Sequence, residues 1–284
     1  MTTVIEAKNL RYSYPNGALG IHNASIRVER GDILAIIGSN GSGKSTLLML
    51  LGGLLKPSHG RLSFFGEHIV DPRKDLKLRR KIGVMLQNPD DTLFNPTVRE
   101  DLEFGPAQLD LSKSQIDARI QDVIESVGLP NEKLAVHPSR ISGGEKQKAA
   151  IASILTFDPD VLLLDEPFAT LDLQSETLLI KRLKESNDLG KTVIIATQKL
   201  ELTPLVADKV ALLGKEKTIE QIGTVRDILT NSDLLRDNGL APPPLVQLGE
   251  RLNLKDPPLT VDEAVYTFQN LRNSSKKEKT PLNS

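Results

Sequence analysis

The chain has 284 residues, 39% of them hydrophobic and 26% charged, which is enough for one large globular domain and one small one. Lys and Arg number 36 against 37 Asp and Glu, so the composition does not favour a nucleic-acid-binding surface. The absence of cysteine excludes disulfides and thiolate metal sites, and it fits a reducing compartment.

The first predicted elements are two strands, residues 4–10 and 24–28, with a turn between them at residues 15–17. We expect them to form a small antiparallel sheet. Tyr14, at the end of the first strand, is either an ordinary strand aromatic or a platform on which a base stacks. Residues 1–6 lack a basic region followed by an apolar one, so we expect no signal peptide.

A third strand, residues 33–37, runs into a glycine-rich loop and then a helix, residues 45–51. The loop, residues 38–46 (GSNGSGKST), matches the phosphate-binding pattern G-x-x-x-x-G-K-[ST]. Its glycines let successive N–H groups point inward, and the helix N-terminus adds partial positive charge. A chance glycine turn is the alternative, and the flanking strand and helix argue against it. The predicted phosphate-binding residues are Gly38, Ser39, Asn40, Gly41, Ser42, Gly43, Lys44, Ser45 and Thr46.

Two side chains of this loop have expected roles in a nucleotide site. Lys44 should reach the β- and γ-phosphates, and the Ser45 hydroxyl should ligate Mg²⁺. The longest apolar stretch of the chain, residues 47–55, overlaps the helix and is far too short to span a bilayer. We therefore expect any membrane role to depend on a partner.

Two further strands, residues 61–65 and 82–86, are predicted next, and the second ends at Gln87. Residues 88–96 are rich in Asn, Asp and Pro, which indicates a loop. The best-formed helix of the following segment spans residues 113–127, between a Ser112 N-cap and a Gly128 stop. We assign its apolar face to core packing, and that face carries Ile116, Ile120, Val123, Ile124 and Val127.

Ser142, Gly143 and Gly144 open another helix, which extends to Leu155. The free N–H groups at its start suit a phosphate by the same physics as the first loop. Because one nucleotide does not readily sit on two separate helix N-termini of one subunit, this interpretation requires a dimer. The alternative is a simple Ser142 N-cap with Glu145 in the first turn, and the local sequence does not decide between them.

The apolar strand at residues 161–166 ends in two acids, Asp165 and Glu166, where an α/β sheet places its ligands. Asp165 should hold Mg²⁺, directly or through water, and Glu166 should polarise the attacking water as general base. The alternative is that the acids merely cap a strand. A helix at residues 174–187 and a strand at residues 192–197 complete a βαβ unit.

The last predicted strands are residues 209–213 and 218–222, and the composition changes after Thr224. We expect residues 241–244 to form a stiff proline linker that joins short helical pieces, one near residues 245–252 and one near residues 261–271. We predict a main domain at residues 1–224, a small C-terminal domain at 225–272 and a disordered tail at 273–284.

Taken together, the motifs resemble those of ABC transporter ATPases, in that family's order and over residues 4–222. They are the Walker A loop at 38–46, the Q-loop residue Gln87, the signature at 142–145, the Walker B pair Asp165–Glu166 and the D-loop at 169–172. Tyr14 lies where the family carries its adenine-stacking aromatic. The resemblance implies an α/β P-loop NTPase of ABC type. Its expected parts are an antiparallel β-subdomain, a helical signature subdomain at about residues 88–156 and a small C-terminal helical extension.

A closer resemblance is to the cobalt-importer and energy-coupling-factor branch of that family. It depends on residues 87–94 (QNPDDTLF), residues 96–101 (PTVRED) and the C-terminal segments 242–244 and 258–264. One motif departs from the family pattern: residues 197–199 read T-Q-K where the family usually has T-H-D. The four histidines, His22, His59, His68 and His137, lie elsewhere and unclustered in the sequence, which argues against a transported metal binding here.

The resemblance implies the ATP-hydrolysing subunit of a membrane importer, peripheral to the cytoplasmic face of the cell membrane. Its cofactors would be ATP and Mg²⁺, with Gln87, Glu166 and Gln198 in catalysis and Ser45, Gln87 and Asp165 around the metal. Ser142, Gly143, Gly144 and Glu145 would contact nucleotide bound to a second cassette. That cassette is another copy or a paralogue. A transmembrane coupling protein and a substrate-binding membrane protein are the other expected partners.

Two rival functions follow from the same motifs. A soluble ABC-type ATPase acting on nucleic acid or ribosomes usually brings a long coiled-coil insertion, a second cassette or a basic surface, and the sequence carries none of these. An ATP-sensing subunit with low turnover is kept open by Gln198, although Glu166 argues against it. Cobalt, nickel and several vitamins all fit the branch as cargo.

Overall fold

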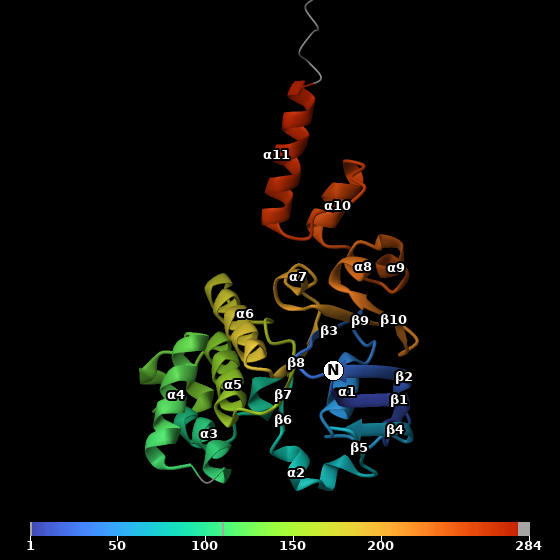
Figure 1. The fold of residues 1–284 in the computed structure, drawn as a ribbon. Coiled ribbons are helices and arrows are strands. Elements are labelled where there is room, and N and C mark those ends of the chain that lie inside the picture. The colour runs from blue at the N-terminus through green and yellow to red at the C-terminus, as the bar shows by residue number, and fades with distance from the viewer. Residues whose placement is uncertain (1, 110, 278–284) are drawn as a thin grey trace, which may run out of the picture.

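Two β-sheets organise the computed structural model, which describes residues 2–109 and 111–277 (Figure 1). The first sheet is antiparallel and has the strand order β2-β1-β4-β5. Its strands are β1 (Thr3–Ser13), β2 (Leu19–Glu29), β4 (His59–Phe64) and β5 (Glu67–His68). The predicted antiparallel sheet is therefore confirmed, with longer strands than the sequence indicated.

The second sheet has six strands in the order β10-β9-β3-β8-β7-β6. All neighbours are parallel except β10, which pairs antiparallel with β9 at the edge. The strands are β3 (Ile33–Ile37), β6 (Ile82–Met85), β7 (Val161–Asp165), β8 (Thr192–Thr197), β9 (Lys209–Leu213) and β10 (Ile219–Thr224). Strands β3, β7 and β8 are buried along their whole length, which explains their unbroken apolar runs.

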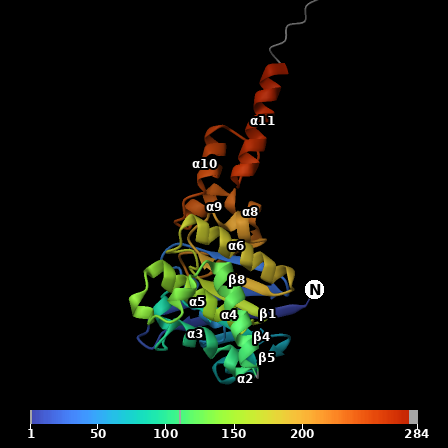
Figure 2. The same ribbon diagram turned by 90° about the vertical axis from the view of Figure 1, so that its left-hand side faces the viewer.

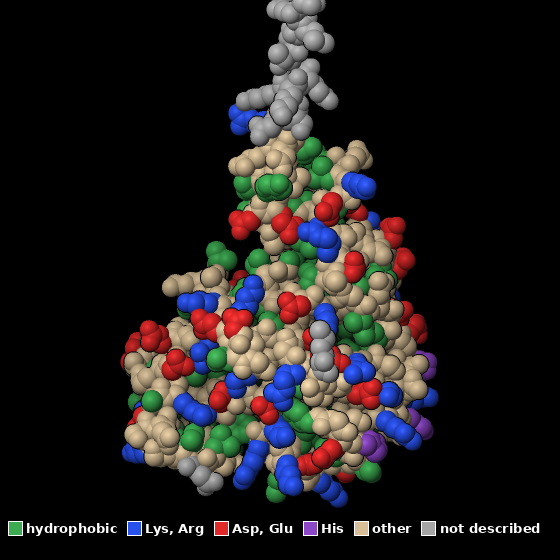
Figure 3. Space-filling model, in the orientation of Figure 1, with side chains coloured by type: hydrophobic (Ala, Val, Ile, Leu, Met, Phe, Trp, Pro, Cys, Tyr) green, Lys and Arg blue, Asp and Glu red, His purple; other side chains and the backbone are tan. Residues whose placement is uncertain are grey.

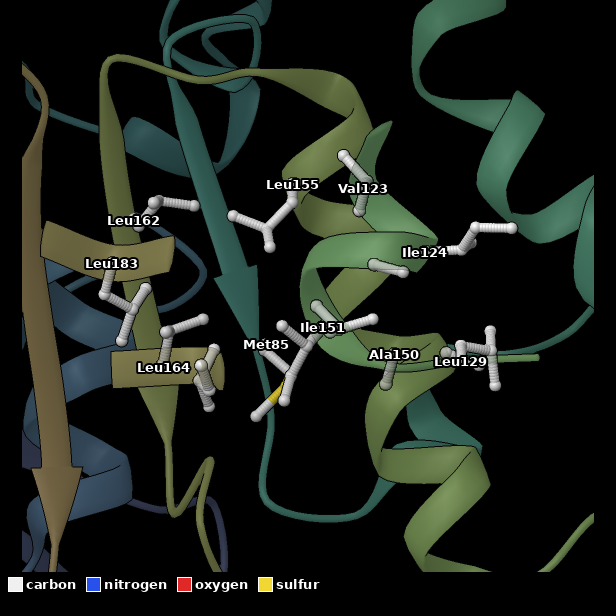
Figure 4. Packing of buried hydrophobic residues seen from close by; sticks show 14 of the residues in the cluster. Met85, Val123, Ile124, Leu129, Ala150, Ile151, Leu155, Leu162, Leu164 and Leu183 are labelled. Atoms are coloured by element: carbon white, nitrogen blue, oxygen red, sulfur yellow. The ribbon is translucent and has the colours of Figure 1, made fainter. Parts of the chain in front are cut away.

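Helix α1 (Lys44–Leu51) lies between the two sheets, and its leucines share one buried cluster with residues of both. On the opposite face of the large sheet lie α3 (Val98–Phe104), α4 (Lys113–Val127), α5 (Gly143–Phe157) and α6 (Leu173–Asp188). Figure 4 shows this second cluster, in which Ile151 and Leu155 of α5 face Met85 of β6 and Leu164 of β7. The sheet that carries the site is thus covered on both faces.

Helix α4 has the bounds that the sequence predicts. The Ser112 side chain caps its N-terminus in a capping box with Gln115, and Gly128 ends it in the left-handed conformation with φ 66°. Of its predicted apolar face, Ile120, Val123, Ile124 and Val127 are buried, and Ile116 is partly buried against the same cluster. The predicted assignment to core packing is confirmed.

The sequence patterns do not mark the shortest helices, because four to six residues are too few to display a helical period. These are α2 (Leu76–Arg79), α7 (Thr203–Val206), α8 (Val225–Leu229) and α9 (Ser232–Asp237). Single 3₁₀ turns lie at Pro72–Lys74, Pro89–Asp91, Pro106–Gln108, Asn131–Lys133 and Pro138–Arg140.

The C-terminal segment continues from the large sheet as a stack of helices. Ile228, Leu229 and Leu235 share a buried cluster with Ile37 of β3 and Leu212 of β9. Helices α10 (Pro244–Arg251) and α11 (Val261–Lys277) then extend away from the sheets (Figures 1 and 2). The domain division after residue 224 stays a prediction. Helix α11 includes the first five residues of the predicted tail, and residues 278–284 lie outside the described residues.

Acidic and basic side chains are interspersed over the face shown in Figure 3, which therefore carries no extended field of one sign. No helix among the described residues is long and apolar enough to cross a membrane.

Candidate functional site

The glycine-rich loop joins β3 to α1 and has the backbone that its sequence predicts. Gly41 and Gly43 take φ values of 78° and 103°, a region that side-chain-bearing residues rarely adopt. A Cβ atom at Gly43 would also lie 2.5 Å from the carbonyl oxygen of Gly20 on β2. The loop therefore needs glycine at position 43 for both conformation and space.

Lys44 folds back over this loop. Its Nζ donates to the carbonyl oxygens of Gly38 at 2.9 Å and Ser39 at 3.3 Å. Burial lowers the pKa of Lys44, and the charges of Glu166 and Asp165 oppose that effect. The ammonium is thus held near both predicted acids, where a phosphate could exchange for the backbone carbonyls.

Asp165 is the last residue of β7 and Glu166 follows it, next to the loop, because β7, β8 and β3 run parallel and end at one edge of the sheet. Asp165 is 1% exposed and Glu166 is 6% exposed. Asp165 Oδ1 and Glu166 Oε1 are buried and make no hydrogen bond within the described chain. Such atoms indicate a missing polar partner, since an unpaired buried carboxylate oxygen is costly.

Glu166 has an unusual backbone, with φ 48°, and several hydrogen bonds hold it. Its N–H donates to Ala196 O at 2.8 Å, and Gln147 Nε2 donates to its carbonyl oxygen at 3.3 Å. The backbone N–H of Gln198 donates to Glu166 Oε2 at 3.2 Å. One carboxylate oxygen is thus fixed, while the other is left for a ligand or a water.

The side chains predicted around Mg²⁺ lie together: Ser45, Gln87 and Asp165 line one hollow at the loop. The Ser45 hydroxyl hydrogen-bonds to the Asp165 carboxylate. Burial raises the pKa of Asp165; the hydrogen bond from Ser45 opposes this rise, the charge of Glu166 adds to it, and Lys44 again opposes it. Carboxylate, hydroxyl and amide oxygens with an unpaired buried acceptor among them fit a hard divalent cation.

Tyr14 lies at the other end of the pocket. Its hydroxyl group hydrogen-bonds to Thr46 Oγ1 at 2.7 Å, and its ring contacts Tyr12 edge-on with centroids 5.1 Å apart. The ring therefore borders the pocket that begins at the phosphate loop, and its role in stacking on a base stays a prediction.

One pocket brings together most of the predicted residues: Tyr14, Asn40, Gly41, Gly43, Lys44, Ser45, Thr46, Gln87, Asp165, Glu166 and Gln198. The carbonyl oxygens of Gly38 and Ser39 accept hydrogen bonds from Lys44 Nζ. Ser42 is buried, and its N–H donates to Ser39 O at 3.2 Å. Three pocket residues were not predicted, namely Leu19, Gly20 and Lys217. Lys217 comes from the β9–β10 hairpin, and no motif in its sequence points to the pocket.

The signature residues do not join this pocket. Ser142 caps α5 in a capping box with Glu145. This is the geometry that the alternative, a simple Ser142 N-cap, requires. The box uses the amides of Ser142 and Glu145 and does not use those of Gly143 and Gly144. Ser142 and Gly143 are exposed, and Thr170 of the predicted D-loop contacts Gly143 O at 3.5 Å. A phosphate on these amides would have to belong to another molecule.

Comparison with known proteins gives consistent matches. The family model described as "ABC transporter" matches residues 21–169. The energy-coupling factor transporter ATP-binding protein EcfA of Methanococcus maripaludis is 39% identical over 254 residues, covering 89% of this chain and 91% of the relative.

Two solved structures have similar folds. The cbiO1 protein of Clostridium perfringens, described as part of the ABC transporter complex cbiONQ, has a TM-score of 0.70 and 31% identity and covers 89% of this chain and 100% of that one. The cassette MJ0796, described as dimeric in a post-hydrolysis state with ADP and Pi, has a TM-score of 0.70 and 26% identity, covering 78% and 99%.

Proposed function

This chain belongs to the ABC transporter family of ATP-binding proteins, and from that membership we propose that it is the ATP-hydrolysing subunit of an energy-coupling-factor importer at the cytoplasmic face of a membrane. The observation that carries the proposal is the pair of buried acids, Asp165 and Glu166, each with an unpartnered oxygen in the described chain, beside Lys44. Buried charge of this kind needs a partner. A nucleoside triphosphate with a divalent cation supplies one.

The mechanism follows from how the carboxylates are held. Glu166 Oε2 is fixed by the Gln198 amide, which leaves Oε1 to accept a proton from the attacking water. Lys44 exchanges its carbonyl partners for phosphate oxygens and stabilises their negative charge. Ser45, Gln87 and Asp165 would hold Mg²⁺. When bound, this ion neutralises charge on the phosphate oxygens.

A dimer completes the site in this proposal. The amides of Gly143 and Gly144 lie outside their own pocket and open a helix of 15 residues, α5, whose N-terminus favours an anion. Two cassettes placed head to tail would enclose ATP between the loop of one and the signature of the other. The second cassette is a copy of this chain or a paralogue.

The membrane partner has a candidate docking groove. Phe94 and Phe104, 64% and 52% exposed, contact each other edge-on with centroids 5.1 Å apart, and both line an apolar groove with Asp91. Buried Asp101 holds the loop in place, because its Oδ1 accepts from Phe94 N at 3.0 Å and Asn95 N at 3.0 Å. We propose that a helix of the transmembrane coupling protein, apolar with a basic end, binds here.

Asp90, the residue before Asp91, pairs with Lys146 at 2.6 Å and does not line the groove. The cargo would be held by the substrate-binding membrane protein and not by this chain. We propose a metal ion such as cobalt, or a vitamin, from the resemblance of the segment after Gln87 to that branch.

Glu166→Gln tests the catalytic part of the proposal. Glutamine keeps the shape of the side chain but cannot take the proton, so hydrolysis should fall about 100-fold or more while ATP still binds. The variant should also accumulate as an ATP-bound dimer, which light scattering on a gel-filtration column detects. Glu67→Gln, an exposed residue of β5, is the matched control.

The two readouts separate the parts of the proposal. A Glu166→Gln protein that hydrolyses ATP at the parental rate contradicts the role of Glu166 as general base. A variant that stays monomeric at saturating ATP and Mg²⁺ contradicts the proposed sandwich.

A further inference from the structure

Lys217 is a basic pocket residue that the mechanism above does not use. It lies in the turn between β9 and β10, in the left-handed conformation with φ 60°, which lysine rarely adopts. The turn is closed by Gly214 N donating to Thr218 O at 2.9 Å and Lys217 N donating to Gly214 O at 3.0 Å. The position of the side chain is therefore set by an ordered hairpin.

This hairpin is attached to the start of β2, at the edge of the pocket. His22 N donates to Lys217 O at 3.0 Å, and the Lys217 ammonium donates to the carbonyl oxygen of Leu19. Thr218 forms a parallel bridge with Asn23. Both ends of the lysine are thus fixed to the strand that borders the pocket.

The neighbouring residues identify which part of the pocket Lys217 occupies. Leu19 precedes Gly20, which packs so closely on the first turn of α1 that a Cβ there would lie 2.8 Å from Thr46 Cγ2. Tyr14 also bonds to Thr46. Lys217 therefore lies at the Tyr14 and Thr46 end, whereas Lys44 lies over Gly38 and Ser39.

We propose that Lys217 is a second nucleotide-binding cation and that its ammonium contacts the α-phosphate of ATP or ADP. The inference rests on the proposed function of the same pocket. The loop lysine reaches the β- and γ-phosphates and the loop amides hold the α- and β-phosphates. If the base stacks on Tyr14, the phosphate nearest to the base is the α-phosphate. A cation between Tyr14 and Thr46 therefore has the α-phosphate as its anionic neighbour. One of its three N–H donors is used by Leu19 O, so others are available to a ligand.

The opposing interpretation is that Lys217 only ties the hairpin to β2. The two differ in what they predict for nucleotide affinity. An α-phosphate contact is present in ATP, ADP and 2′-deoxy-ATP alike, so its loss should weaken all three by one factor. A purely structural tie should change thermal stability and leave the three dissociation constants unchanged.

The experiment measures these dissociation constants by calorimetry with Mg²⁺ for the full chain and four variants. Lys217→Met removes the charge, Lys217→Arg keeps it, and Lys217→Gly removes the side chain at a position whose φ suits glycine, so it should fold at least as well. Lys215→Met is the matched control, since Lys215 is exposed, lies in the same hairpin and donates to Asp237 O at 2.6 Å.

We expect Lys217→Met and Lys217→Gly to raise the dissociation constants of all three nucleotides by the same factor, about 3- to 10-fold, since Lys217 is half-buried and solvent screens part of its attraction. Lys217→Arg should lose less nucleotide affinity, and Lys215→Met should have the dissociation constants of the parent. Parental affinities in Lys217→Met, or a loss that disappears for 2′-deoxy-ATP, would overturn the assignment. Failure of the parent to bind ATP would instead contradict the proposed function.

Discussion

Asp165 illustrates how a single buried residue is tuned for a ligand. Burial raises its pKa above the ordinary value of 3.8, despite a hydrogen bond from Ser45. Because the folded pKa is raised above the unfolded one, the proton stabilises the native state at low pH, and that stability is lost as pH rises through the raised pKa. Above the raised pKa the ionised carboxylate therefore destabilises the protein without its cation.

Asp165→Asn should therefore raise the melting temperature of the nucleotide-free protein in chelator at pH 7.5. A rise of about 2–4 °C corresponds to ~1 kcal/mol in a chain of this size. The difference from the parent should shrink as the pH falls towards 4, because the raised pKa makes the parent carboxyl group take up its proton at a higher pH than an ordinary aspartate. Thermal unfolding at both pH values measures this difference in melting temperature, with Asp233→Asn, a change at an exposed residue, as the control. A lower melting temperature at pH 7.5 would show that the charge is stabilised instead.

Gln198 is the residue where the sequence departs from its family. It is exposed at the pocket, and only its backbone N–H is bonded to Glu166. A histidine there would donate a hydrogen bond to the γ-phosphate and could become cationic as charge develops. The glutamine amide can donate too, but it stays neutral.

Gln198→His should therefore speed hydrolysis by one to two orders of magnitude, equivalent to about 1–3 kcal/mol of transition-state stabilisation. The parent should hydrolyse ATP slowly but measurably, because Glu166 and Lys44 are in place. Single-turnover rates of parent and variant decide the matter. A variant no faster than the parent would mean that glutamine substitutes fully for histidine.

Among the elements, the segment from Gln87 to α3 connects the pocket to the proposed docking groove. Gln87 lines the pocket, and seven residues later Phe94 lines the groove. Asp101 on α3 fixes the loop between them by accepting hydrogen bonds from Phe94 N, Asn95 N and Asn95 Nδ2. A change at the pocket can thus reach the groove through a short, hydrogen-bonded segment.

Phe94→Ala should reduce recruitment to membranes that carry the coupling protein by at least about 10-fold, because exposed aromatics at such grooves dominate binding. Basal ATP hydrolysis should stay within 2-fold, since Phe94 does not line the nucleotide pocket. Leu189→Ala removes an even more exposed apolar side chain, directly after α6, and should change neither property. Co-purification of Phe94→Ala at the parental level would exclude the groove as the docking site.

Elements with long patterns or strong end signals could be predicted from sequence, and short ones could not. Strands β3, β8 and β9 and helix α4 have their predicted bounds, because apolar runs or caps define them. Helices α8 and α9 have five and six residues, and tertiary burial against β3 and β9 stabilises them. That burial depends on contacts distant in sequence, which a local pattern cannot reveal.

At the scale of the whole molecule, the site too has residues that a sequence pattern predicts and residues that only distant contacts bring in. The loop residues, Asp165, Glu166 and Gln198 could be predicted to meet, because parallel strands bring their carboxyl ends together. Lys217 could not, since it reaches the pocket through a left-handed turn and a bridge to β2, neither of which has a sequence signature. The separation of Ser142 from the pocket fits the dimer hypothesis, which stays a prediction.

The central position of β3 in the large sheet has a consequence for how the protein is made. Its neighbours are β8 and β9, which end at Thr197 and Leu213, so the strand before the phosphate loop gains its pairing only from residues far along the chain. A nascent chain still short of Leu213 leaves an apolar strand with open edges, which is exposed to aggregation until synthesis proceeds. We therefore expect nucleotide affinity to arise late in translation, so that ATP binding reports on completion of the sheet.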